Sequence, residues 1–170
     1  MDRYESLFKH YGERFHVPWT LLESMAHIAQ LYTDHPDYIG MMGISQRIYT
    51  NHVGVKFRLY NPECNIEVAA NQVAVLCNRF ADIHDSLNHY RFVLTAFRES
   101  SEMVYNAMRL AREEEGLPSS YKHWRAAGKP LGQWAEWSYT KTFFQLTEES
   151  NTLEYVESVI HCWSTMAQTA

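Results

Sequence analysis

The sequence has few of the residues that mark several protein classes. Its 170 residues include seven glycines, five prolines and three cysteines, and no segment is repetitive or of low complexity. Cys64, Cys77 and Cys162 are an odd number of cysteines without the spacing of a zinc ligand set. We therefore expect free thiols in a reducing compartment, with no disulfide framework, no metal site and no cofactor.

The sequence also lacks a long apolar run and an excess of positive charge. Residues 1–15 are charged and amphipathic, unlike the apolar core of a signal peptide, and no later segment is long and apolar enough to span a bilayer. These features predict a protein made in the cytoplasm without a cleaved signal or a membrane span. A net charge of −5 leaves no basic surface for phosphate groups, which argues against a nucleic-acid partner.

Hydrophobic residues are abundant, and most of them recur at helical spacing. They make up 46% of the chain, and aromatic residues alone make up 14%, enough for a sizeable core in one domain covering residues 1–170. The periodicity predicts an all-α fold. The expected helices run from Tyr4 to about Phe15, Val17 to Gln30, Asn61 to Phe80, Leu87 to Phe97, Met103 to Ala111 and Asn151 to Trp163.

Three segments interrupt this helical pattern. Residues 40–45 form a small apolar knot that resembles a hairpin, and residues 48–60 are mixed and predict mostly loop. Residues 119–150 form a less periodic insertion that contains Trp124, Trp134 and Trp137. These tryptophans could anchor the insertion or stack on sugar rings. We expect Trp134 and Trp137 to form a contact surface for a second copy or another protein, because Trp is enriched at the centres of interfaces.

A series of short motifs follows in one order along nearly the whole chain. They are Leu21-Leu22, Gly40-Met41-Met42, Asn65-Ile66-Glu67 with Ala69-Ala70, Ala96-Phe97 and Glu154-Tyr155-Val156. In this order they resemble the lytic transglycosylase domain related to goose-type lysozyme, in the short form found in phage virion proteins and secretion machines. The resemblance implies a lysozyme-like helical fold with a groove for peptidoglycan glycan strands. The groove residues that it implies are Gly40, Met41, Met42, Gly43, Phe97, Glu99 and Tyr155.

The sequence departs from this family where the family has its chemistry. The family cleaves glycan strands with one glutamate, and the expected Glu-Ser pair falls at Ala29-Gln30. A methyl group cannot act as a general acid. Gly43 replaces the glutamine after the turn, and residues 98–102 replace the glycine-rich sugar-binding turn. These changes predict an inactive, structural or glycan-binding protein of a phage particle or cell-wall-associated assembly.

An active enzyme with a relocated acid is the alternative reading. Glu23-Ser24 spells the family's Glu-Ser pair, but six residues of helix give ~600° of rotation, so Glu23 points about 120° away from Ala29. Glu99 and Glu102 fall at the edge of the expected groove. A helix N-terminus favours an ionised carboxylate there, which does not suit a group that must hold its proton near neutral pH.

Overall fold

The described residues of the chain form an almost entirely helical structure, which confirms the all-α prediction. The computed structural model describes residues 2–32, 37–46, 58–117, 132–144 and 151–169. In these ranges the α-helices are α1 (Glu5–Phe15), α2 (Trp19–Ala29), α4 (Pro62–Arg79), α5 (Ser86–Arg98), α6 (Ser101–Glu114), α8 (Trp137–Thr140) and α9 (Thr152–Thr169). Short 3-10 turns are η1 (Asp2–Tyr4), η2 (Gln30–Tyr32), η3 (Arg58–Tyr60), η4 (Gln133–Ala135) and η5 (Lys141–Phe143).

Local capping explains where several helices begin. The Asn61 side chain accepts hydrogen bonds from the backbone N–H groups of Glu63 (2.9 Å) and Cys64 (3.2 Å), and Pro62 occupies the first turn of α4. Ser100 caps α6 by accepting from Met103 N at 3.2 Å. These side chains satisfy N–H groups that a helix start leaves without a partner.

The first two helices differ slightly from their predicted bounds. α1 ends where His16 adopts a left-handed conformation with φ 57°, and its N–H bonds to Glu13 and Gly12 carbonyls. α2 begins at Trp19 instead of Val17, because Pro18 has an extended ψ of 119° and stands just outside the helix. Its backbone oxygen accepts the first hydrogen bonds of α2, from Leu21 at 3.0 Å and from the next residue.

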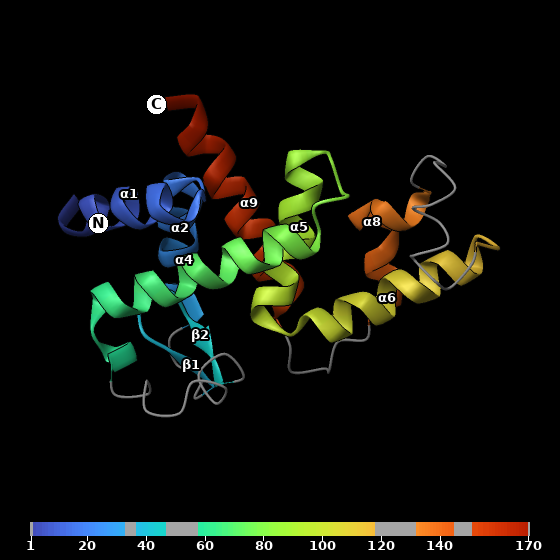
Figure 1. Ribbon diagram of the computed structural model, residues 1–170, viewed down its shortest axis with the longest axis horizontal. Coiled ribbons are helices and arrows are strands. Elements are labelled where there is room, and N and C mark those ends of the chain that lie inside the picture. The colour runs from blue at the N-terminus through green and yellow to red at the C-terminus, as the bar shows by residue number, and fades with distance from the viewer. Residues whose placement is uncertain (1, 33–36, 47–57, 118–131, 145–150, 170) are drawn as a thin grey trace.

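The helices pack in a branched order along the molecule (Figure 1). α2 packs against α1 and α9, and α4 packs against α1 and α5. α5 in turn contacts α9 and α6, while α6 holds η4, η5 and α8. Figure 1 shows the hairpin below the blue helices at one end and α6 with α8 at the other. α5 therefore connects the two ends of the structure.

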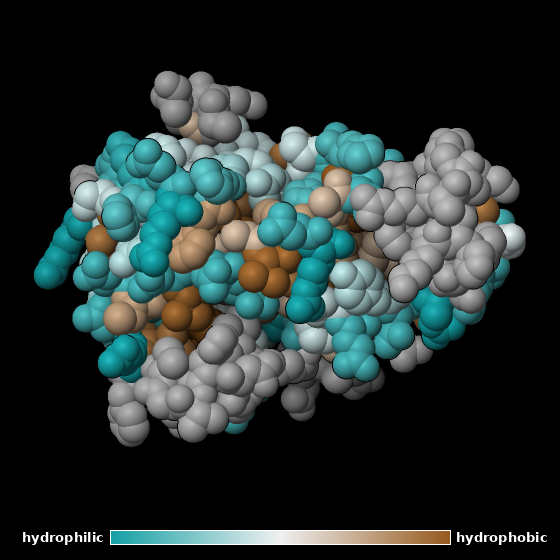
Figure 2. Space-filling model, in the orientation of Figure 1, coloured by the Kyte–Doolittle hydropathy of each residue, from teal (hydrophilic) through white to brown (hydrophobic). Residues whose placement is uncertain are grey.

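The predicted apolar faces form the core. On α4, Ile66, Ala69, Ala70, Val73 and Leu76 are buried, as the helical spacing predicted. The largest fully buried side chains include Trp134, Trp137, Tyr155, Phe8, Phe92 and Phe97. The face seen in Figure 2 is mostly hydrophilic, with small separate hydrophobic areas. Within the described ranges, no helix has the length and apolar content needed to cross a membrane.

The described residues also contain a two-stranded antiparallel hairpin. β1 (Tyr38–Ile39) pairs with β2 (Ile44–Ser45), so the predicted hairpin is confirmed. Its loop closes with a hydrogen bond from Gly43 N to Gly40 O at 3.0 Å. Gly40 and Gly43 have φ values of 72° and 59°, a left-handed conformation that favours glycine.

One buried asparagine fixes this hairpin to α4. The Asn65 side chain donates to the backbone oxygens of Ile39 and Leu59, each at 3.0 Å, and accepts from Met42 N at 2.8 Å. A Cβ on Gly40 would lie 2.2 Å from the Asn65 side-chain nitrogen, so a larger residue does not fit there. Asn65 thus sets the position of the loop that carries Gly43.

Candidate functional site

Four segments of the chain meet around Gly43 and Arg98. They are the end of α2, the hairpin, the end of α5 and the start of α9. A Cβ on Gly43 would lie 3.2 Å from the Cβ of Ala29 and 3.3 Å from Nη1 of Arg98. Ala29 is 4% exposed, and its small side chain allows this close approach of the hairpin. Ala29, at the end of α2, therefore lies against the Gly40–Gly43 turn.

Arg98 is the central residue of this region. It is 2% exposed, and its ζ carbon lies 3.5 Å from the ring centroid of Tyr38 and 4.4 Å from that of Tyr155. Its Nη2 donates to the Asn151 side-chain oxygen at 3.5 Å. We call Arg98, Tyr38, Tyr155 and Asn151 the Arg98 cluster. Its cation–π contacts stabilise the charge where water is largely excluded.

Glu99 makes a second connection beside the cluster. It follows the last residue of α5 and accepts a hydrogen bond from Thr152 Oγ1 at 2.6 Å. Thr152 is fully buried at the first position of α9. Arg98 and Glu99 therefore both join the end of α5 to the start of α9. These two charged residues thus help to fix the junction between α5 and α9.

The other residues predicted for the groove divide into surface and core. Gly40 and Gln30 are exposed, and Met41 is half-buried. Met42, Phe97 and Tyr155 are almost completely buried, so their side chains form the core and do not present a surface to a glycan. This corrects the expectation that these three would line an open groove. The polar loop between α2 and the hairpin includes residues 33–36, which lie outside the described residues.

The two alternative acids lie in different places. Glu23 is half-buried on α2, about 1.7 turns before Ala29, as ~3.6 residues form each turn. Glu102 is exposed in the first turn of α6. Glu99, in contrast, accepts a hydrogen bond from Thr152, the residue that follows Asn151 of the Arg98 cluster.

The predicted contact surface around Trp134 and Trp137 does not agree with the structure. Both tryptophans are buried, at 0% and 1% exposure. Asn88 holds this segment by donating to Ala135 O and accepting from Trp137 N at 2.7 Å. Phe92 packs edge-on against Trp137, with 4.9 Å between ring centroids. Trp137 thus anchors the segment to α5 and Trp134 anchors it to α6, where Arg112 lies over its ring, while Trp124 lies outside the described residues.

The groups that decide what chemistry the site can perform are the methyl group of Ala29 and the buried guanidinium of Arg98. Arginine keeps its proton at all physiological pH values, so Arg98 cannot deliver the proton that glycoside cleavage needs. Ala29 has no ionisable atom. Elsewhere in the described ranges, no group of three or more His, Cys, Asp or Glu side chains is arranged to hold a metal ion. The geometry is suited to holding four chain segments together.

Sequence reasoning missed the roles of Arg98, Tyr38 and Asn151. One signal for Arg98 was present: it follows residues 92–97, which are apolar except for Thr95 and are all buried. A charged residue in such a run is buried only when it has partners. Tyr38 and Asn151 come from distant segments, and no local pattern marks them.

Comparison with known proteins does not assign the chain to a family. No family model matches the sequence, and no curated protein matches it. A function is therefore inferred from the site residues and the sequence motifs.

Proposed function

We propose that this protein is a catalytically inactive relative of lytic transglycosylases, with a lysozyme-like fold that serves a structural or glycan-binding role. The assembly would be a phage particle or a cell-wall-associated machine, a setting that comes from the sequence resemblance alone. Its partners would be glycan strands of peptidoglycan, another protein or a second copy of the chain.

The observation that carries this proposal is the environment of residue 29. The resemblance places the family's only catalytic carboxyl there, and in this chain Ala29 and the Arg98 guanidinium both approach Gly43. The loss is not confined to one atom, because the positive charge of Arg98 reaches the same turn as residue 29. A nearby guanidinium stabilises the ionised form of a carboxyl group and so opposes general acid chemistry.

The position of the hairpin supports the lysozyme-like part of the proposal. The turn with Gly40 and Gly43 faces the end of α2, as the family motifs imply for the turn and the catalytic helix. Asn65, from the motif on α4, makes the hydrogen bonds that hold this turn. Motifs that are distant in the sequence thus meet in one place.

A peptidoglycan assay tests the proposal. Purified sacculi are incubated with the protein, and soluble products are analysed by mass spectrometry, with an active lytic transglycosylase as the positive control. We expect no anhydro-muropeptides and no other released fragments. Co-sedimentation with the same sacculi then separates the two roles: retention in the pellet indicates glycan binding, and its absence leaves the structural role.

An active enzyme with a relocated acid is the second candidate, and Glu99 is its acid by position alone, as the carboxylate that directly follows α5 and Arg98. Release of anhydro-muropeptides by the wild type would establish this reading and refute the first. The variants Glu99→Gln and Glu23→Gln would then identify the acid. Loss of one catalytic acid reduces the rate by about 10²–10⁴-fold.

A further inference from the structure

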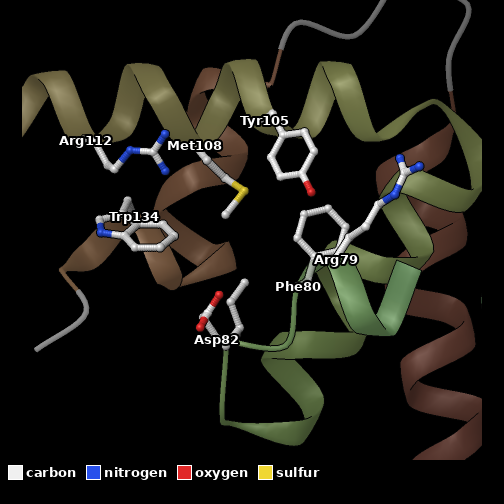
Figure 3. Close-up of a pocket in the computed structure, with 8 residues that line it drawn as sticks. Arg79, Phe80, Asp82, Tyr105, Met108, Arg112 and Trp134 are labelled. Atoms are coloured by element: carbon white, nitrogen blue, oxygen red, sulfur yellow. The ribbon is translucent and has the colours of Figure 1, made fainter. Parts of the chain in front are cut away.

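A separate pocket lies between the end of α4, the segment that precedes α5, α6 and η4 (Figure 3). It has a volume of about 230 Å³ and shares no residue with the Arg98 cluster. Its lining consists of apolar and aromatic side chains with a few charged ones: Arg79, Phe80, Asp82, Ile83, Tyr105, Met108, Arg112 and Trp134.

Aromatic rings form two sides of this pocket. Phe80 and Tyr105 lie together on one side, with ring centroids 5.4 Å apart, and Trp134 lies on the other (Figure 3). The Met108 side chain points into the space between them. Tyr105 is 41% exposed and so borders the opening. Flat aromatic walls and an adaptable thioether suit a planar apolar ring.

Arg112 makes the Trp134 end of the pocket positive, while Arg79, at the Phe80 end, donates a hydrogen bond to Ser101 Oγ. Arg112 is 6% exposed, and its ζ carbon lies 5.0 Å from the ring centroid of Trp134. Burial lowers the pKa of Arg112, and the positive charge of Arg109 lowers it further, while Glu113 raises it. A negative group beside this guanidinium would therefore be stabilised in a partly desolvated place.

We propose that this pocket binds a small planar aromatic carboxylate, with its ring between Tyr105 and Trp134 and its carboxylate beside Arg112. The volume is below the ~300–1,000 Å³ usual for drug-sized ligands, which fits one ring or two fused rings. Asp82 lies on the other side of Trp134 from Arg112 in Figure 3, so its negative charge keeps the carboxylate at the Arg112 end. This site is independent of the proposed function.

The first experiment compares 2-naphthoate with its uncharged analogue 2-naphthamide. Each is titrated into the full chain, and binding is followed by calorimetry and by the NMR signal of the Trp134 indole N–H. We expect naphthoate to bind and to shift this signal, and naphthamide to bind roughly tenfold more weakly, because hydrogen bonds to charged groups are the stronger ones. Equal affinities, or no naphthoate binding at millimolar concentration, would overturn the proposal.

Two arginines on α6 provide a matched pair of variants. Arg112→Gln should reduce naphthoate affinity roughly tenfold while leaving naphthamide affinity nearly unchanged. Arg109→Gln removes the same charge from an exposed residue that pairs with Glu113 at 2.8 Å, and it should leave naphthoate affinity within about twofold of the wild type. Equal losses in the two variants would mean that general charge, not this pocket, attracts the ligand.

A second set of variants keeps the test decisive if Arg112→Gln does not fold. Tyr105→Ala removes an exposed wall of the pocket and should weaken both ligands, whereas Tyr60→Ala, at an exposed tyrosine of η3, should change neither. Asp82→Asn should strengthen naphthoate binding selectively, since it removes a like charge. Unchanged affinity in Tyr105→Ala, or a weaker naphthoate complex in Asp82→Asn, would refute the site.

Discussion

Single residues decide the character of the candidate site. Ala29 lets the hairpin approach α2, and Arg98 carries a charge into the same place. That Ala29 lies at the end of a helix could be predicted from the sequence, because helical periodicity is a local property. The partners of Arg98 could not, because Tyr38 and Tyr155 reach it from segments far away along the chain.

Introducing a carboxyl group at position 29 should not create a general acid. In Ala29→Glu we expect the carboxylate to pair with Arg98, with a pKa below the ordinary ~4.3 of glutamate and no peptidoglycan cleavage. The pKa can be measured by NMR titration of the labelled side chain. The uncharged control, Ala29→Gln, should unfold at lower urea concentration than Ala29→Glu, because it cannot form the ion pair. A pKa raised toward neutrality would contradict this account.

His89 should make stability depend on pH. Its Nδ1 bonds to Phe80 O at 3.0 Å, and burial lowers its pKa from 6.5, although hydrogen bonds to the Phe80 and Ile83 backbone oppose this shift. Above pH 6.5 the ring is neutral in both states. As the pH falls further, the unfolded chain takes up the proton first, so the free energy of unfolding decreases until the pH reaches the lower folded-state pKa.

Urea unfolding at a series of pH values from 7.5 to about 5 measures this effect. His89→Asn should lose less stability over that interval than the wild type. His84→Asn, at an exposed histidine five residues earlier, should keep the wild-type slope. Identical slopes in all three proteins would show that His89 does not titrate differently on folding.

Secondary structure was predictable where neighbouring residues determine it. α4 has a capping Asn61, Pro62 in its first turn and a continuous apolar face, so its existence and start were correct. η4 and α8 have no such local signals. They are held by Glu115, whose carboxylate accepts from the N–H groups of Gln133 and Trp134, and by Asn88 of α5. Long-range hydrogen bonds of this kind cannot be read from a local pattern.

Removing the Asn65 side chain should loosen the hairpin from α4. Asn65→Ala leaves Ile39 O, Leu59 O and Met42 N without a hydrogen bond that the native structure provides. Because an unsatisfied buried polar group costs about 1–3 kcal/mol, we expect the free energy of unfolding to fall by several kcal/mol. Asn71→Ala, at an exposed position of the same helix, should change it by about 0.5 kcal/mol or less. Similar losses in both variants would contradict this role.

Asn88 should control the local stability of η4 and α8. In Asn88→Ala the Trp137 N–H loses its acceptor, and Ala135 O loses its donor. We expect hydrogen exchange to increase more at Trp137 and its neighbours than in α1 and α2, because the lost contacts are in this segment. The comparison variant is Asn78→Ala, at an exposed residue of α4. Unchanged exchange at Trp137 would show that ring packing alone holds the segment.

At the scale of the whole molecule, α5 contacts α9 and α4 as well as α6 and α8. Near its start, Asn88 holds η4 and α8, and at its end Arg98 reaches the hairpin and α9. The sequence predicted one domain but had no means of identifying this linking role. A helix that serves both regions should make them unfold together, because loss of α5 removes anchors from each.

Labelling the tryptophans with fluorine allows this cooperativity to be tested directly. Trp163 lies on α9, where its indole N–H donates to Thr20 Oγ1 of α2 at 3.0 Å, and Trp134 and Trp137 lie at the opposite end. In a urea titration followed by ¹⁹F NMR, we expect the native signals of all three to disappear with one midpoint. If Trp134 and Trp137 lost their native signals at lower urea than Trp163, the two ends would be separate folding units. The same titration is then repeated with Asn88→Ala, which weakens the contact of α5 with η4 and α8 alone. If the molecule unfolds as one unit, this change should lower the midpoint of all three signals together.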